Sequence, residues 1–340
     1  MKATIIFGGQ FGSEGKGLLA SNLVWQAQGF NKPYDLCTTD AGPNAGHTAI
    51  MEDGAKVVTF HLPMMGVLSP GALIWLNGGA IINPEILMRE IRDMESLGFN
   101  IRERLAIHPN ASLILPEDVE EEKDPSSPMS KISSTQKGVG AAAIRRMRRA
   151  PGTLMAKDWG DLRPYTRNPV HPSSYSNISV EVAQGHSLNI NSRFYPYTTF
   201  RCCNPAQGLM NANIPTTVEQ EVWAVIRVNP IRVGNLPDGY SGDVFDDQHE
   251  TSWEALGQEP QYTTVTNRVR RVFTYSKLQV EKMIRETLPT GILINFAQTV
   301  PDETLKDYIN HIYGVYKLLK ADKPMILAGF GPKSSDVHFK

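Results

Sequence analysis

The first seventeen residues constrain the fold of this chain more than any other segment. A short apolar run, residues 3–7, opens into the glycine-rich residues 8–17, and a helical pattern of leucines follows. A buried strand that runs through glycines into a helix N-terminus presents backbone N–H groups to a phosphate. The segment departs from the P-loop signature, because Gly9 lies too early relative to Gly15 and Gly17 stands where Ser or Thr would hold Mg²⁺. A phosphate site is therefore predicted here, and an ordinary strand-to-helix turn is the alternative.

Apolar segments alternate with helical patterns along the rest of the chain. The expected strands, after the first, are residues 34–39, 72–76, 180–183, 222–228, 292–296 and 325–330, and the expected helices begin near residues 16, 84 and 301. This alternation predicts an α/β fold with a mostly parallel central sheet flanked by helices. Because ligands bind at the carboxyl ends of parallel strands, we expect the loops 8–17 and 40–48 to converge on one crevice. No linker or repeat divides residues 1–340, which predicts one domain with long functional loops, and the acidic, proline-containing residues 115–135 are expected to form a surface loop.

Composition excludes several classes of function. The formal net charge is −1, from 34 basic and 35 acidic residues, so no overall field attracts nucleic acid or a membrane surface. The three cysteines, Cys37, Cys202 and Cys203, have neither metal-ligand spacing nor a disulfide pattern, which suits a reducing compartment. No run of about 18 apolar residues is present. We expect a soluble, cytoplasmic protein that acts on small molecules, with no nucleic-acid or membrane partner.

Three further patterns could carry chemistry. His47 follows Gly46 in the second loop; beside a triphosphate, its imidazole could donate to a phosphoryl oxygen, and the Gly46 carbonyl could bind Mg²⁺. The basic residues 145–149 could reach a phosphomonoester across a subunit boundary. Residues 263–271 alternate hydroxyl and guanidinium groups, which suits a dicarboxylate. Each pattern also has a structural explanation: a buried structural histidine, a solvated helix face and a charged edge strand, respectively.

These pieces occur together, and in this order, in adenylosuccinate synthetases. The family's opening G-x-Q-W-G-D-E-G-K-G is similar to residues 8–17, its N-A-G-H-T to residues 44–48, its T-x-x-G-x-G to residues 135–140, its A-Q-G to residues 183–185, its Y-P-Y-x-T to residues 195–199, its R-V-G to residues 232–234, and its arginine-rich aspartate loop to residues 264–271. The resemblance spans nearly the whole chain. It implies a ligase that transfers the γ-phosphoryl group of a nucleoside triphosphate to O6 of a purine nucleotide, after which aspartate displaces the phosphate.

The resemblance also implies a set of site residues. Those implied for catalysis are Ser13, Lys16 and His47. Those implied for the nucleoside triphosphate are Gly12, Glu14, Gly15, Lys16, Gly17, Asn295, Gln298, Gly331 and Pro332. Those implied for the purine nucleotide are Ser13, Asn44, Ala45, Ser134, Thr135, Arg149, Gln184, Thr199 and Val233. Those implied for aspartate are Thr264, Val265, Thr266, Arg268 and Arg270. The implied Mg²⁺ ligands are Ser13 and Gly46, and the implied assembly is a homodimer in which Arg149 acts across the subunits.

Two departures from the family pattern bear on the substrates. Ser13 stands where most members carry an aspartate, and a serine hydroxyl is not a base at neutral pH without an activating partner. Losing the carboxylate makes room for the 2-amino group of guanine. Residues 295–297 lack the carboxylate with which the family reads the guanine of GTP. Both departures resemble the family's bacteriophage branch, in which dGMP and aspartate are joined with the hydrolysis of ATP, and for such an enzyme the host cytoplasm is the expected location.

Other functions remain open at this point. The ordinary family reaction would use IMP, aspartate and GTP. A nucleotide-binding switch would share the opening loop without ligase activity, and a nucleotide kinase would make a diphosphate without consuming aspartate.

Overall fold

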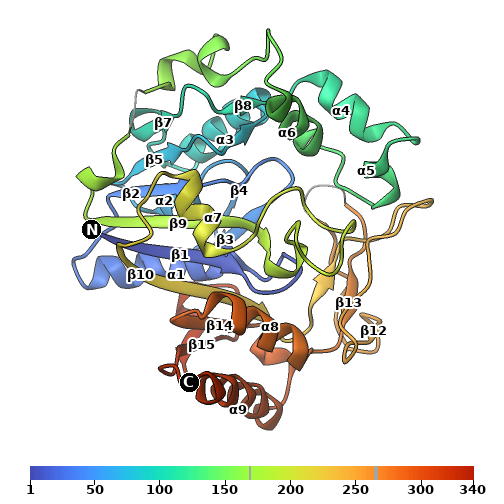
Figure 1. Cartoon of the computed structure of the whole chain (residues 1–340). Helices are drawn as coiled ribbons and strands as arrows, with labels where there is room; N and C mark the ends of the chain where they lie inside the picture. The colour runs from blue at the N-terminus through green and yellow to red at the C-terminus, as the bar shows by residue number, and fades with distance from the viewer. Residues whose placement is uncertain (168–169, 264–266) are drawn as a thin grey trace.

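A mostly parallel sheet forms the centre of this computed structural model, which describes residues 1–167, 170–263 and 267–340 (Figure 1). Within the described residues, nine strands follow one another across it: β16 (Val337–Phe339), β15 (Met325–Gly329), β14 (Gly291–Asn295), β10 (Glu219–Arg227), β1 (Lys2–Gly8), β9 (Asn177–Gly185), β2 (Leu36–Thr39), β5 (Leu73–Leu76) and β7 (Leu105–Ile107). Neighbouring strands are parallel except for the β15–β16 pair, which is antiparallel. The predicted α/β class with a mostly parallel sheet is confirmed.

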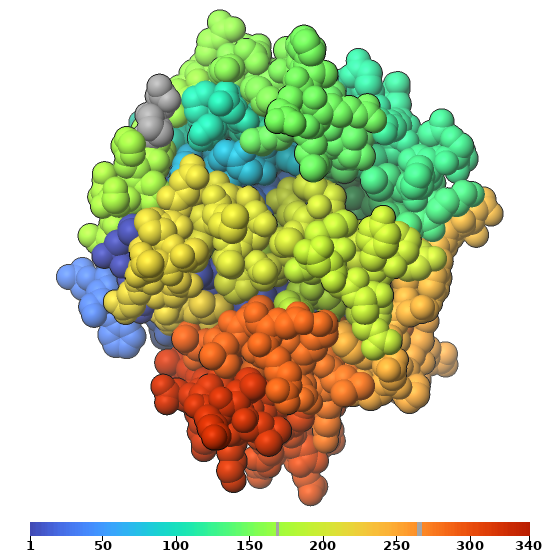
Figure 2. Space-filling model, in the orientation of Figure 1, coloured from blue at the N-terminus to red at the C-terminus, as the bar shows by residue number. Residues whose placement is uncertain are grey.

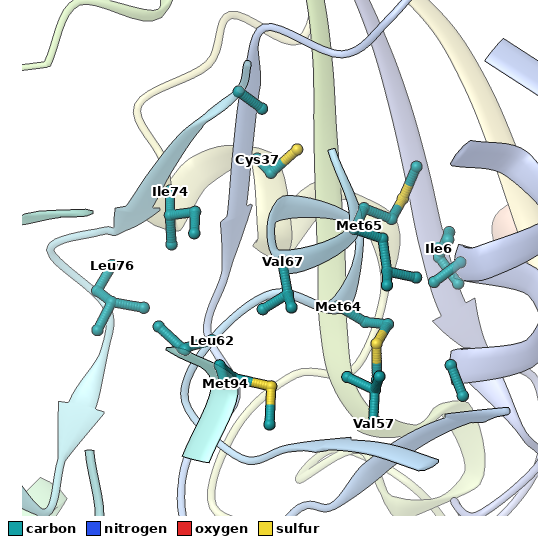
Figure 3. Close-up of a cluster of buried hydrophobic side chains, with 14 of the residues drawn as sticks. Ile6, Cys37, Val57, Leu62, Met64, Met65, Val67, Ile74, Leu76 and Met94 are labelled. Atoms are coloured by element: carbon teal, nitrogen blue, oxygen red, sulfur yellow. The ribbon is translucent and has the colours of Figure 1, made fainter. Parts of the chain in front are cut away.

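Helices cover both faces of the sheet because alternate strand residues point to opposite faces. Ile6 packs in a buried cluster with α1 (Lys16–Gly29), α2 (Met64–Leu68) and α3 (Pro84–Ser96), part of which is drawn in Figure 3. Ile5 packs in a second cluster, on the other face, with α7 (Pro205–Asn211), α8 (Lys277–Thr287) and α9 (Asp302–Leu319). Each face of the sheet thus has its own apolar core.

Smaller elements surround the carboxyl ends of the strands. These are the hairpin of β3 (His47–Ile50) and β4 (Lys56–Thr59), the pair β6 (Ile81–Ile82) and β8 (Ser112–Leu113), the sheet of β11 (Ile231–Arg232), β13 (Arg271–Phe273) and β12 (Glu250–Thr251), and the helices α4 (Pro116–Lys123), α5 (Pro128–Lys131) and α6 (Val139–Arg148). Single 3₁₀ turns are η1 (Arg102–Arg104), η2 (Ala156–Asp158), η3 (Arg163–Tyr165), η4 (Pro172–Ser174), η5 (His186–Leu188), η6 (Ala297–Thr299) and η7 (Ser334–Asp336).

The expectation of a surface loop at residues 115–135 was wrong. Helices α4 and α5 lie there, and two of the acidic side chains are buried. Glu122 accepts the backbone N–H groups of Gly138 and Gly140 at 2.8 and 2.7 Å, at the start of α6. Asp118 pairs with Arg145 at 2.7 Å. The acidic run resembled a solvated segment, but these carboxylates stabilise a neighbouring helix and its arginine.

The strand order places the glycine-rich loop between two halves of the molecule. Strand β1 lies between β9 and β10, so the loop that follows it has β9 and β2 on one side and β10 and β14 on the other. In the space-filling view, segments from the middle of the sequence (teal to green) form the upper part and C-terminal segments (orange to red) form the lower part (Figure 2). No helix in the described part of the chain is both long and apolar enough to cross a membrane.

Gly17 lies where α1 packs against β3. A Cβ atom at Gly17 would overlap the backbone of Thr48, whereas a Cβ atom at Gly29, at the other end of α1, would meet no atom within 4 Å. We expect Gly17→Ala to lower the free energy of unfolding by about 1–3 kcal/mol, because the helix or β3 must shift. Gly29→Ala is the matched control and should leave stability equal or slightly higher. Thermal unfolding followed by calorimetry measures both, and equal Tm values for the two variants would contradict the close packing.

Candidate active site

A cavity of about 690 Å³ opens where the carboxyl ends of β1, β2, β9, β10 and β14 meet. The loops 8–17 and 40–48 both line it, so their predicted convergence is confirmed. The lining contains many of the site residues implied by the resemblance: Gly12, Ser13, Gly15, Lys16, Gly17, Asn44, Ala45, Gly46, His47, Ser134, Thr135, Gln184, Thr199, Val233 and Arg270. Residues that are far apart in the sequence therefore line one cavity.

The carboxylate of Glu14 braces the glycine-rich loop from inside. This side chain is fully buried, and its Oε1 atom accepts the N–H groups of Gln10 at 3.0 Å and Gly12 at 2.7 Å. Its Oε2 atom lies 3.5 Å from Nζ of Lys16, which also donates to the carbonyl of Gln184 at 2.7 Å. Glu14 does not line the cavity. Its contacts fix the turn and direct Lys16 toward β9.

Four non-glycine residues that line the cavity have a left-handed backbone. They are Ser13 (φ 60°) in the loop after β1, Ser133 (φ 54°) after α5, Gln184 (φ 65°) near the end of β9 and Phe296 (φ 62°) directly after β14. L-residues adopt this conformation at a cost of about 1–2 kcal/mol each, and such positions concentrate at functional sites. All four line the cavity.

Glu181 is a site residue that the sequence reasoning missed. Its Oε2 atom lies 3.2 Å from Nδ1 of His47, and its Oε1 atom accepts the N–H of Met65 at 2.7 Å. Because a carboxylate only accepts hydrogen bonds, it selects the proton on Nδ1 and fixes the ring orientation. Nε2 of His47 is buried and has no hydrogen-bond partner among the described residues. Glu181 is the one charged residue of β9, and this was the signal that could have revealed the pair.

Buried cations give the cavity its charge. Arg227 and Arg232 are 1% and 3% exposed, and neither forms an ion pair within the described residues. Burial lowers the pKa of each guanidinium to about 9; the neighbouring charge of Arg270 adds to this for Arg227, and that of Arg271 for Arg232. Burial likewise lowers the pKa of Arg270 to about 10. All three remain charged at neutral pH, so the cavity favours anions.

Several implied residues lie outside the cavity lining. Arg268 donates to the carbonyls of Gly234 at 2.9 Å and Ser134 at 3.0 Å, which ties its loop to neighbouring segments. The amide of Asn295 donates to the carbonyl of Glu14 at 3.0 Å and accepts the N–H of Phe296 at 2.8 Å. Besides Glu14, the other such residues are Gln298, Gly331, Pro332 and Arg149, which is exposed at the end of α6. Thr264, Val265 and Thr266 lie outside the described residues. The roles expected for all of these stay predictions.

Comparison with known proteins identifies the family. A family model described as adenylosuccinate synthetase matches residues 5–159. The chain is 36% identical to an N6-succino-2-amino-2'-deoxyadenylate synthase of Salmonella phage PMBT28, over 99% of this chain and 97% of that protein. It is 31% identical to an adenylosuccinate synthetase of Methanococcus maripaludis, over 93% of this chain and 88% of that protein. The chain belongs to the adenylosuccinate synthetase family.

Solved structures agree with this membership. A succinoaminodeoxyadenylate synthetase of cyanophage S-2L, bound to dGMP and to dATP as an energy donor, superposes with a TM-score of 0.86 at 32% identity, covering 99% of this chain and 95% of that one. An adenylosuccinate synthetase from Plasmodium falciparum shares the fold, with a TM-score of 0.74 at 18% identity and 99% of each chain covered. The family resemblance inferred from the sequence is confirmed.

The role of Arg227 in the charge of the cavity can be tested through protein stability and anion binding, without measuring catalysis. Arg227 donates to the side chain of Gln261 at 3.1 Å but has no ionic partner in the described part of the chain. Because a charge buried without an ionic partner costs free energy, its replacement by an apolar side chain of similar length should be neutral or stabilising. We expect ligand-free Arg227→Met to match or exceed the parent protein in its free energy of unfolding by up to about 1 kcal/mol. Tripolyphosphate should raise the Tm of the variant less than that of the parent, because a cation that attracts the anion is lost.

Arg145→Met is the matched control for this experiment. It removes a cation whose partner Asp118 is buried, so it should destabilise the protein by about 2 kcal/mol. It should leave the tripolyphosphate shift unchanged, because Arg145 does not line the cavity. A strong loss of stability in ligand-free Arg227→Met would show that Arg227 is structural instead.

Proposed function

We propose that this chain is an ATP-dependent ligase that joins L-aspartate to C6 of dGMP and forms N6-succinyl-2-amino-2'-deoxyadenylate. The observation that carries the proposal is the full-length similarity to phage synthases of this product, one of them solved with dGMP and dATP, combined with a serine at position 13 of the cavity. The buried cations suit the charges of the three substrates, which are all anions.

The first step is the transfer of the γ-phosphoryl group from ATP to O6 of dGMP. A bond forms between O6 and the γ-phosphorus, the bond to the β–γ bridging oxygen breaks, and ADP leaves while N1 of the base loses its proton. Such a step depends on positioning and on neutralising charge more than on covalent catalysis. Lys16 and the loop amides would hold the phosphates, and Nε2 of His47 would hydrogen-bond to the phosphoryl oxygen or to O6.

The second step is displacement of phosphate by aspartate. The amine attacks C6, the C6–O6 bond breaks, phosphate leaves, and the nitrogen loses a proton. Arg270 would bind a carboxylate of aspartate, and its place in the cavity lining, which also includes Thr263, supports this role. Arg268 would act less directly, by holding the loop through the carbonyls that it already contacts.

The cavity lining includes oxygen donors that suit Mg²⁺, among them Ser13 and the backbone of Gly46. The described residues contain no cluster of three or more His, Cys, Asp or Glu side chains that could hold a metal on their own. Mg²⁺ does not need one, because it is commonly bound by substrate phosphates and water with one or two protein oxygens. The carbonyl of Gly46 and the hydroxyl of Ser13 are the protein ligands that we propose, and the ion would neutralise charge on the phosphates.

We further propose a homodimer in the host cytoplasm. Arg149 is exposed at the C-terminal end of α6, away from the cavity of its own chain, so it is free to bind the phosphate of dGMP held by a partner subunit.

The test is phosphate release in the presence and absence of aspartate. We expect release with dGMP and ATP to require aspartate and to yield the succinylated nucleotide, identified by mass. IMP and GMP, each with ATP and with GTP, run in parallel. Preferred use of IMP with GTP would indicate the ordinary family reaction, formation of dGDP would indicate a kinase, and release independent of aspartate with every purine would end the ligase proposal.

Ser13 should set the choice of purine. Ser13→Asp restores the carboxylate typical of the family and fills the space beside the 2-amino group, so the ratio of kcat/KM for dGMP to that for IMP should fall at least tenfold, or about 1.4 kcal/mol. Ser13→Ala is the control, because it removes the hydroxyl and adds no base; it should weaken the use of dGMP without improving the use of IMP. An unchanged ratio in Ser13→Asp would place selection for the 2-amino group elsewhere.

Glu181 should act through His47. Glu181→Gln presents an amide N–H to Nδ1 and favours the wrong proton position, so kcat should fall about 100-fold or more while the KM for ATP changes little. Glu90→Gln is the matched control, since Glu90 lies 3.2 Å from Nδ1 of His61 in a buried pair outside the cavity lining. Its kcat per folded enzyme should equal that of the parent. Equal losses in both variants would show that the effect is general to buried pairs.

A further inference from the structure

The side chain of Asp40 extends the pairing of two strands past the point where their backbones separate. Strands β2 and β9 are paired in parallel up to Thr39 and Glu181. Asp40 follows β2 directly, and its Oδ1 atom accepts the N–H of Ala183 at 3.0 Å. A side-chain oxygen therefore holds the carboxyl ends of the two strands together, at the edge of the sheet where the cavity opens.

The second oxygen of this carboxylate binds segments from later in the sequence. Oδ2 of Asp40 lies 3.1 Å from Nη1 of Arg201, and it accepts the amide N–H of Asn211, at the end of α7, at 3.0 Å. The same Nη1 atom donates to the backbone carbonyl of Asp40. The carboxylate is 1% exposed and the guanidinium side chain 10%, so salt screens their attraction little. One buried ion pair thus attaches the segment of Arg201 to the end of β2.

Three of the segments that meet at this pair carry residues that we propose for the purine nucleotide. Asn44 lies in the loop that follows β2, Gln184 lies near the end of β9, and Thr199 lies in the segment that the arginine attaches. All three line the cavity. Asp40 and Arg201 are outside the lining, so the pair can act on a nucleotide only through the residues that it positions.

Arg201 is also the attachment point of a hydrogen-bonded loop. The N–H of Ile190 donates to the carbonyl of Arg201 at 3.1 Å, and the N–H of Thr199 donates to the carbonyl of Leu188 at 2.8 Å. The guanidinium carbon lies 4.5 Å from the ring centroid of Phe200, which lines the cavity. The two ends of residues 188–201 are therefore bound to each other, and the arginine fixes them against β2.

We propose that Arg201 is a positioning residue for the purine nucleoside monophosphate, and that its ion pair with Asp40 sets the place of Thr199 relative to the residues on β9 and after β2. The inference rests on the proposed function in taking a purine monophosphate as the ligand of these segments. A ligand held from several segments needs them in register, because a displacement of about 1 Å can cost about 100-fold in rate.

Calorimetric titration of the full-length protein tests the positioning role without requiring the reaction. The ligands are dGMP, IMP and inorganic tripolyphosphate, with Mg²⁺ present throughout. Arg201→Met should weaken binding of whichever monophosphate the parent binds by about tenfold or more, because the loop that carries Thr199 loses its attachment. Tripolyphosphate binding should stay within about twofold, since the contacts that Glu14 makes in the glycine-rich loop do not involve the arginine.

A double variant separates positioning from stability. Arg201→Met alone leaves a carboxylate buried without its cation, so its Tm should fall. Asp40→Asn combined with Arg201→Met removes both charges, while an amide oxygen at position 40 can still accept the N–H of Ala183. The Tm of the double variant should return close to that of the parent, yet its monophosphate binding should stay about tenfold weaker. Recovery of binding together with the Tm would show a purely structural pair and would overturn the proposal.

The control removes an ion pair at the opposite end of the sheet. Lys2 and Glu221 form a pair at 2.7 Å between β1 and β10, outside the cavity lining. Lys2→Met combined with Glu221→Gln should leave the binding of all three ligands unchanged. Unchanged monophosphate affinity in Arg201→Met would overturn the positioning role, and so would an equal loss of tripolyphosphate binding, which would indicate a general disturbance of the cavity.

The outcome is distinguishable from failure of the proposed function. If the parent binds a monophosphate but does not consume aspartate, the ligase proposal fails, while the titrations still decide the role of Arg201. A parent that binds neither dGMP nor IMP would overturn both proposals. In the active enzyme, the double variant should raise the KM for the monophosphate about tenfold and leave kcat and the KM for ATP within about twofold.

Discussion

The buried carboxylate of Glu14 is the interaction on which the rest of the site depends. Its oxygen atoms accept two N–H groups of the turn after β1 and lie beside the ammonium group of Lys16, so a segment of glycines, which by itself is conformationally free, has one shape. The same turn is tied to β14 through Asn295 and to β9 through the carbonyl of Gln184. Hydrogen bonds to this one loop thus fix the strand ends that supply both proposed nucleotide sites.

Charge in the cavity shows how function opposes stability. Arg227 and Arg232 are buried without acidic partners in the described part of the chain, an arrangement that is unfavourable in the absence of ligand, and burial accordingly lowers the pKa of both. Elsewhere buried carboxylates have partners, as Asp118 has Arg145 and Glu90 has His61. Arg227 and Arg232 are the exceptions, and they lie where we propose that three anionic substrates bind.

Much of the architecture could be predicted because its signals are local. An apolar run followed by glycines predicts a strand and a phosphate loop, and regular alternation predicts a parallel sheet whose loops converge. Residues 115–135 could not be predicted in this way, since the composition of an acidic helix resembles that of a solvated loop. Only the packing of α4 against α6 distinguishes them, by giving Glu122 and Asp118 their partners. The same reason explains why Glu181 was missed: its meaning comes from His47, 134 residues away in the sequence.

The sequence by itself determined the fold class, the family, and the presence of Ser13 where most members of the family carry an aspartate. Each of these follows from the type and spacing of neighbouring residues. The tertiary structure alone decided that Arg270 lines the cavity while Arg268 contacts carbonyls, that Asn295 binds the loop, and that the guanidinium group of Arg227 lies over the ring of Phe296. These distinctions depend on the direction of each side chain after long-range packing. Residues of the same type that are close in sequence can therefore differ in role, and only the folded chain separates them.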